Sequence, residues 1–263
     1  PAPVVKPLPL NAEHKAHLAG EVRRRLANCV PWSRSTRWQP ELNITGASYN
    51  TLNVFPEVKP SDREVYDLRP GEFADSPNKE FRYAVKLHRR SHPLTTWWGP
   101  NLGTVVFDED VEIPILFQRK EGGEPGEWNV YPWMSLTPGE ILTLRVGTKL
   151  AKGHVVIGGL GLGHQLIEVS KRNAVREITL VELSQELVDW YLPQVVPHLN
   201  GKKLNVRVGN AFEIIPTLKA DVGLLDMFPR YGENHSPTKQ LARKSKGIKK
   251  MWGWGTSEDP RRG

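Results

Sequence analysis

The chain has 263 residues, of which 38% are hydrophobic and 25% charged, a composition typical of globular proteins and not of disordered or fibrous ones. Its single cysteine, Cys29, excludes an intrachain disulfide and a zinc site built from several thiolates. No apolar run approaches the roughly 20 residues that span a bilayer, and the first residues lack the pattern of a signal peptide. We therefore expect a cytoplasmic protein with no membrane partner.

The net charge of +7 is unevenly distributed along the chain. Residues 239–263 hold eight Lys or Arg and two acidic residues, a net of +6, so the rest of the chain is almost neutral. Such a segment can bind a polyanion, and nucleic acid is then the expected partner. A solvated basic helix is the alternative and the commoner meaning of such a segment.

Residues 1–30 are expected to form an N-terminal extension. Its start is rich in proline, and Leu18, Val22 and Leu26 recur at helical spacing, which predicts a short helix over residues 11–28.

Residues 31–136 are expected to form an irregular region that contains β-strands. Proline, glycine and scattered aromatic residues predict loops over residues 31–100. Short β-rich runs, separated by acidic and glycine-rich turns, then predict a small antiparallel meander with strands over Thr104–Phe107, Glu112–Arg119 and Trp128–Tyr131.

Residues 137–238 show a regular alternation of helices and strands. Thr137, Pro138 and Glu140 form the pattern of a helix start, and that helix is expected to end before Gly153. Parallel strands joined by right-handed helical crossovers make a Rossmann-like three-layer α/β sandwich with a mostly parallel sheet. Its predicted strands cover His154–Ile157, Ile178–Val181, Leu204–Val208 and Val222–Leu225, with helices over residues 163–173 and 184–192 and a helical turn over Phe212–Leu218.

Residues 239–263 are either a basic tail or the last helix and strand of this fold, predicted over residues 236–246 and Ile248–Trp254. Only 37 residues follow Asp226, which leaves no room for the three further strands of the full fold. We expect a sheet that is truncated at its C-terminal end or completed by the N-terminal region.

A glycine-rich turn lies in the segment VVIGGLGLGHQLIEV. Gly158, Gly159, Gly161 and Gly163 let a ligand approach the backbone and the N-terminus of the next helix. The dinucleotide fingerprint would need glycine or alanine where this chain has His164, so that class of site is not expected. A plain connection between a strand and a helix is the other explanation of the turn.

Further candidate residues follow the other predicted strands, at the edge where open α/β folds bind ligands. They are Glu182 and Leu183 after the second strand, Asn210, Ala211 and Phe212 after the third, and Asp226 after the fourth. A carboxylate at the position of Glu182 can accept both ribose hydroxyls of a nucleoside cofactor.

The segments IGGLGLG, ITLVELS, VRVGNAF and VGLLDMFP together resemble the cofactor half of class I S-adenosylmethionine-dependent methyltransferases. IGG and LVE resemble in particular the spermidine-synthase-like branch, and the resemblance covers residues 137–230. It implies S-adenosyl-L-methionine as cofactor, with the glycines beside its methionine part, Glu182 on the ribose, and Asn210 with Phe212 at the adenine. It further implies in-line methyl transfer to an unknown acceptor, with Asp226 at the reaction centre as hydrogen-bond acceptor or base.

The sequence departs from that family at several positions. Ile157 stands where the family has an acidic residue, and Asn210 where it usually has aspartate. Aminopropyltransferases bind their amine with acidic residues that are missing here, in the glycine turn and at Met227, so polyamine synthesis is not expected. Two alternatives stay open. One is a non-catalytic binding or assembly module of this fold, and the other is a nucleic-acid-binding protein acting through residues 239–263. A homo-oligomer is compatible with each.

The histidines do not predict a metal site. His14 and His17, like His88 and His92, have a helical spacing, but neither pair has a third ligand. These histidines are expected at the surface, and so is His164, although its place beside the glycine turn would allow contact with a carboxylate.

The tryptophans allow two interpretations each. Trp97, Trp98 and Trp133 either pack in the core or line a substrate pocket. Trp252 and Trp254 either stack on nucleic-acid bases or are buried in the fifth strand.

Overall fold

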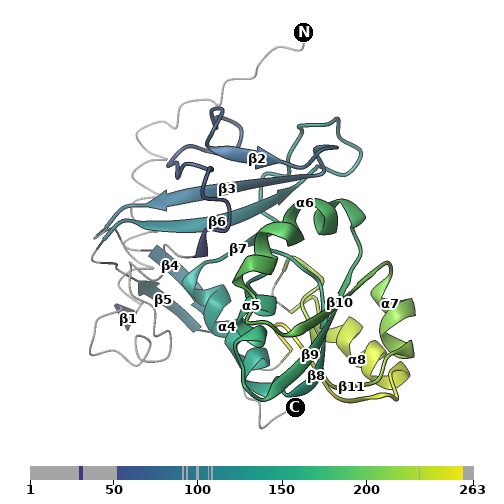
Figure 1. The fold of residues 1–263 in the computed structure, drawn as a ribbon. Helices are drawn as coiled ribbons and strands as arrows, with labels where there is room; N and C mark the ends of the chain where they lie inside the picture. Colours follow the sequence, from purple (N-terminus) through teal and green to yellow (C-terminus); the bar gives the residue numbers. More distant parts are fainter. Residues whose placement is uncertain are drawn as a thin grey trace.

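The computed structural model describes residues 52–256, apart from 91, 93, 99–100, 106, 108 and 231, together with the two-residue strand β1 (Val30–Pro31). The helix predicted over residues 11–28, with His14 and His17, lies outside the described residues, as do the side chains of Trp97 and Trp98. The described part of the chain contains three sheets, with five, four and three strands. In Figure 1 the antiparallel four-stranded sheet lies above the parallel five-stranded sheet.

The parallel sheet has the strand order β10-β9-β8-β11-β12. Every neighbouring pair is parallel, and each strand lies within a few residues of its predicted position. The strands are β8 (Gly153–Gly158), β9 (Val175–Glu182), β10 (Lys203–Val208), β11 (Ala220–Leu225) and β12 (Ile248–Gly253). The Rossmann-like α/β class expected from the sequence is confirmed.

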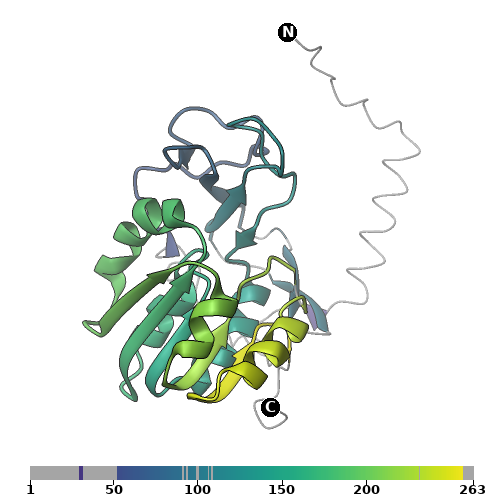
Figure 2. The same cartoon turned by 90° about the vertical axis from the view of Figure 1, so that its right-hand side faces the viewer.

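Helices cover both faces of this sheet, so that three layers result. Alternate residues of β8 face opposite ways: Val155 packs in the larger core cluster and Val156 in the smaller one. The larger cluster is covered by α4 (Pro138–Leu150), α5 (His164–Ser170) and α6 (Gln185–Val195). The smaller is covered by α7 (Ala211–Ile214), the 3-10 turn η3 (Ile215–Thr217) and α8 (His235–Lys244), and Figure 2 shows α7 and α8 in front of the sheet.

The C-terminal segment belongs to this sheet as far as Gly253, where β12 ends. Strand β12 pairs with β11, and Trp252 is only 5% exposed. A Cβ atom on Gly147 of α4 would collide with the Trp252 ring, so this indole is buried and base stacking by it is ruled out. Half-buried Trp254 donates its Nε1–H to Thr143 Oγ1 at 2.8 Å. The N-terminal region does not complete the parallel sheet in the part of the chain that the structure describes, because its strands form the other two sheets.

The predicted antiparallel meander is wrong in its pairing. Strand β6 (Val111–Gln118) pairs along its whole length with β3 (Phe81–His88), from the segment expected to be loops. The remaining strands of this sheet are β2 (Phe73–Asp75) and β7 (Met134–Ser135). Trp128 forms only an isolated bridge with Arg119. The partner of a strand depends on contacts distant in sequence, which the local pattern does not contain.

Two residues of the first predicted meander strand, Thr104 and Val105, also lie in a different sheet. Strand β5 (Asn101–Val105) pairs with β4 (Leu94–Trp98) and with β1, so residues 101–105 belong to the three-stranded sheet.

An aromatic cluster joins the antiparallel sheet to the parallel one. Phe55 packs on Tyr83 of β3, with ring centroids 4.7 Å apart, and Tyr83 lies 5.9 Å from Tyr191 of α6. Tyr191 also donates its hydroxyl to the carbonyl of Leu162, in the glycine turn, at 3.2 Å. Because buried aromatic contacts of this kind fix orientation as well as distance, the cluster holds β3 beside the turn.

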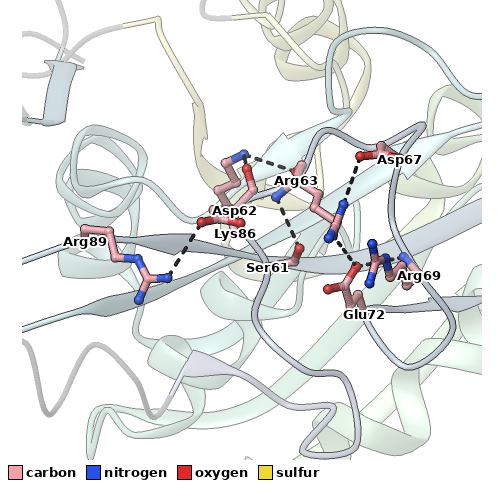
Figure 3. Close-up of polar contacts among 8 residues, drawn as sticks. All are labelled: Ser61, Asp62, Arg63, Asp67, Arg69, Glu72, Lys86 and Arg89. Atoms are coloured by element: carbon pink, nitrogen blue, oxygen red, sulfur yellow. Dashed lines mark hydrogen bonds and ion pairs between the residues drawn. The ribbon is translucent and has the colours of Figure 1, made fainter.

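The loop before β2 is tied to β3 by surface polar contacts (Figure 3). Lys86 Nζ donates to the carbonyls of Asp62 and Arg63 at 2.7 and 3.1 Å, and Arg63 also pairs with Asp67 at 3.1 Å. Exposed ion pairs contribute about 0–1 kcal/mol each, so this network orders the loop and adds little to overall stability.

Candidate functional site

The glycine turn between β8 and α5 requires glycine for steric reasons. Gly159 has a φ of 95° and Gly161 a φ of 49°, both in the region that other residues rarely adopt. A Cβ on Gly159 would collide with the carbonyl oxygen of Asp226, and one on Gly161 with the sulfur of Met134. The turn therefore lies directly against Asp226, the residue that follows β11.

Glu182 ends β9, and two backbone amides orient its carboxylate. Oε2 accepts a hydrogen bond from Leu160 N of the glycine turn at 2.7 Å, and Oε1 accepts one from Ser184 N at 2.9 Å. Ser184 in turn caps α6, because its Oγ accepts from Leu187 N at 3.1 Å. Each carboxylate oxygen retains a lone pair for a ligand.

Asn210 follows β10 and caps α7. Its Oδ1 accepts a hydrogen bond from Phe212 N at 2.9 Å, and its Nδ2 donates to Glu213 Oε1 at 3.3 Å. The side chain is therefore held within its own turn, and only the second lone pair of Oδ1 and the second amide hydrogen remain for a ligand.

These strand ends border a single cavity of about 240 Å³. Eight of the ten predicted site residues line it: Gly159, Gly161, Glu182, Leu183, Asn210, Ala211, Phe212 and Asp226. Gly158 and Gly163 do not. Gly158 is buried in β8 against Leu225 and Met227, and Gly163 packs against Val195 at the start of α5.

The other wall of the cavity was not predicted. Phe81 at the start of β3 and Gln118 at the end of β6 come from the antiparallel sheet, and Trp133 lies just before β7. Met227 and Phe228, which follow Asp226, line it as well. The sequence allowed Trp133 as a pocket residue and placed Met227 and Phe228 at the substrate edge of the sheet. It did not indicate Phe81 or Gln118, because no local pattern shows that β3 and β6 reach this edge.

Asp226 is accompanied by a second carboxyl group that the sequence suggested only as a helix cap. Thr137 Oγ1 accepts from Glu140 N at 3.4 Å, as expected, but the Glu140 carboxylate accepts from Ser135 N at 3.3 Å. Burial raises the pKa of Asp226 to about 7. Burial, and then the charge of Asp226, raises the pKa of Glu140 well above its usual value. Each of the two carboxyl groups therefore holds its proton to a higher pH than an exposed carboxyl group does.

His164 is buried, contrary to expectation. As the first residue of α5 its side chain is only 7% exposed, and burial lowers its pKa to about 4. A surface position was expected as the commoner case for a histidine near the start of a helix. Gly163 of the turn, however, packs against Val195 of α6, and α5 contacts α4. The buried imidazole is therefore neutral at physiological pH.

No metal centre is found among the residues that the structure describes, which contain no cluster of three His, Cys, Asp or Glu suited to one. His88 lies in β3, so His88 and His92 do not share a helix, and a ring nitrogen of His88 contacts the His92 carbonyl at 3.0 Å. Within the same residues, no helix is both long and apolar enough to cross a membrane.

A parallel sheet in this order, with a cavity across the carboxyl ends of β8, β9, β10 and β11, is the arrangement of Rossmann-like α/β proteins. No known family model matches the chain, and neither does any curated protein sequence. Several solved structures match parts of the chain, all at low similarity.

Among those structures, spermidine synthase from Thermotoga maritima is 15% identical, with a TM-score of 0.36, over 73% of this chain and 64% of that one. A candidate RNA methyltransferase from Pyrococcus horikoshii is 21% identical, with a TM-score of 0.32, over 45% of this chain and 60% of that one. Shikimate dehydrogenase from Mycobacterium tuberculosis is 14% identical, with a TM-score of 0.27, over 48% and 42%. The match spans less than two thirds of each of these proteins.

Proposed function

We propose that the chain is an S-adenosylmethionine-dependent methyltransferase that binds its cofactor in the cavity of about 240 Å³. The observation that carries this proposal is the Glu182 carboxylate, which two backbone amides hold in the cavity lining beside a turn where Gly159 and Gly161 leave no room for side chains. A fixed anionic acceptor at this place suits the two hydroxyls of a ribose.

The residues present fit such a cofactor at three further points. Leu183 and Phe212 offer apolar surface for an adenine, and Asn210 retains one acceptor and one donor position beside them. Gly161 lines the cavity with its backbone, against which the methionine part would lie. The cofactor supplies an electrophilic methyl group on a positively charged sulfur.

The chain itself has to align the acceptor, exclude water and handle its proton. Phe81, Trp133 and Phe228 form an apolar wall that excludes water. Asp226, whose pKa burial raises to about 7, can accept a proton from the acceptor near neutral pH.

Calorimetric titration with S-adenosylmethionine and S-adenosylhomocysteine tests the proposal. Glu182→Gln keeps the shape of the side chain but removes its charge, and hydrogen bonds to a charged group contribute about 1.5–3 kcal/mol. We expect Kd to rise at least roughly tenfold. Asp189→Asn, on the exposed face of α6, is the matched control and should bind normally. Unchanged affinity in folded Glu182→Gln would remove the assignment, and a wild type that binds neither compound would favour the non-catalytic module.

Aminopropyl transfer is a second candidate, favoured by one observation. The sequence contained no obvious second acid for an amine, but the structure places Glu140 close enough for the charge of Asp226 to raise its pKa. Two neighbouring carboxyl groups would attract an alkylammonium acceptor. Preference for decarboxylated S-adenosylmethionine over S-adenosylmethionine in the same titration would favour this reaction, and the reverse preference would exclude it.

A further inference from the structure

The edge of the parallel sheet opposite the cavity is basic along its whole width. Because all five strands are parallel, the connections that lead from a helix into a strand lie together at this edge. Each of the five connections carries at least one Lys or Arg: Lys152 before β8, Lys171 and Arg172 before β9, Lys202 before β10, Lys219 before β11 and Lys246 before β12.

We define the basic edge as these connections with the adjoining helix and strand ends, residues 149–152, 168–177, 199–203, 219–221 and 244–249. The five segments hold eleven Lys or Arg and three acidic residues, a net of +8. Only the last segment belongs to residues 239–263. Most of the net charge of the basic edge therefore comes from residues 1–238, which are almost neutral as a whole, and the fold gathers these cations at one edge.

The three acidic residues of the basic edge are already paired. Asp221 pairs with Lys249 at 2.6 Å, and the hydrogen bond from Lys249 lowers the pKa of Asp221. Glu177 pairs with Lys203 at 2.7 Å, and the third acid, Glu168, with Lys171 at 2.6 Å. Within the described part of the chain, six lysines of the basic edge have no ion pair: Lys149, Lys152, Lys202, Lys219, Lys244 and Lys246.

Helix ends explain only part of this pattern. Cations stabilise the last turn of a helix, which accounts for Lys149 and Lys244. Lys152, Lys219 and Lys246 lie beyond the helices and are exposed. Six uncompensated cations at one edge repel one another in the free protein, and a bound polyanion would relieve that repulsion.

We propose that the basic edge is a docking surface for the phosphate backbone of a duplex nucleic acid. Five strands about 4.8 Å apart make a row of about 19 Å, along which a duplex carries roughly eleven phosphates. The five segments contain no aromatic residue on which the bases of a single strand could stack. Of the six large hydrophobic side chains exposed in the described residues, only Val196 lies near this edge, so a membrane surface is not favoured.

This surface is separate from the cavity, and the proposal does not depend on the proposed reaction. Strands of six to eight residues, at about 3.3 Å per residue, separate the two edges by about 20–26 Å. Of residues 239–263, for which nucleic-acid binding was expected, the proposal includes only residues 244–249. They would act together with four segments distant in sequence.

Fluorescence anisotropy with a labelled DNA duplex of about 20 base pairs, over about 50–200 mM salt, tests the proposal. The test variant is Lys152→Gln/Lys219→Gln/Lys246→Gln, which changes three exposed side chains on three connections. If each lysine contacts one phosphate, the slope of log K against log salt should become shallower by about 2.7, and Kd should rise at least roughly tenfold at low salt.

Two controls accompany this variant. Lys59→Gln/Arg69→Gln/Lys120→Gln removes three exposed cations from the N-terminal region and should bind like the wild type. Replacing Lys152, Lys219 and Lys246 by arginine keeps the three charges and should leave duplex binding unchanged. Normal binding by this variant would show that the three positions tolerate substitution, so that weaker binding by the Gln variant reflects lost charge. The proposal is overturned if the wild type shows no salt-dependent duplex binding, if both Gln triples bind equally well, or if the wild type prefers single-stranded DNA or phosphatidylserine vesicles to the duplex.

Discussion

Replacing Asp226 by asparagine tests the buried carboxyl group most directly. Burial raises the pKa of Asp226 to about 7, from a usual value of 3.8. The folded protein therefore keeps this proton while the unfolded chain loses it, so the free energy of unfolding falls as pH rises from about 4 to about 7. At about 1.4 kcal/mol per pKa unit, a shift of about three units corresponds to about 4 kcal/mol lost by pH 8.

Asp226→Asn cannot ionise and is close in shape, so it should lack this loss. Urea unfolding at pH 4 should give similar free energies of unfolding for wild type and variant. At pH 8 the variant should be more stable by up to about 4 kcal/mol. Asp189→Asn, exposed on α6, serves as the control and should follow the wild type at every pH. If the difference between wild type and Asp226→Asn is the same at pH 4 and pH 8, the buried-carboxyl reasoning is refuted.

Two further predictions concern the glycine turn. Gly159→Ala should lower the free energy of unfolding more than Gly161→Ala, because its Cβ would meet the Asp226 backbone, whereas that of Gly161 would meet a flexible Met134 side chain. Urea unfolding should show that Gly161→Ala lowers the free energy of unfolding by about 1 kcal/mol, chiefly because residue 161 has a positive φ. A loss for Gly161→Ala that equals or exceeds the loss for Gly159→Ala would contradict this prediction. The His164 ring should remain neutral down to about pH 4, since burial lowers its pKa to that value. NMR of the imidazole nitrogens checks this, and half-protonation near pH 6.5 would show that the side chain is solvated.

The sequence by itself determined the elements whose signals are local. The strands and helices of the Rossmann-like unit follow from apolar runs a few residues long. Ser184 and Thr137 begin helices because a capping side chain bonds to amides within its own turn. The glycine turn and Glu182 could also be assigned to the site from the sequence. Each directly follows or ends a predicted strand, and parallel strands place all their carboxyl ends at one edge of the sheet.

Only the tertiary structure decided which distant residues meet at that edge. The pairing of β3 with β6 brings Phe81 and Gln118 to the cavity. The packing of α4 on the sheet places Glu140 beside Asp226, a residue far away in the sequence.

The burial of His164 and the charge of the basic edge were decided in the same way. Four of the five basic segments come from a stretch of the sequence that is nearly neutral on average. The burial of a side chain, its pKa and the sum of charges on a surface depend on which segments pack together. Local propensity and spacing contain no information on those long-range contacts.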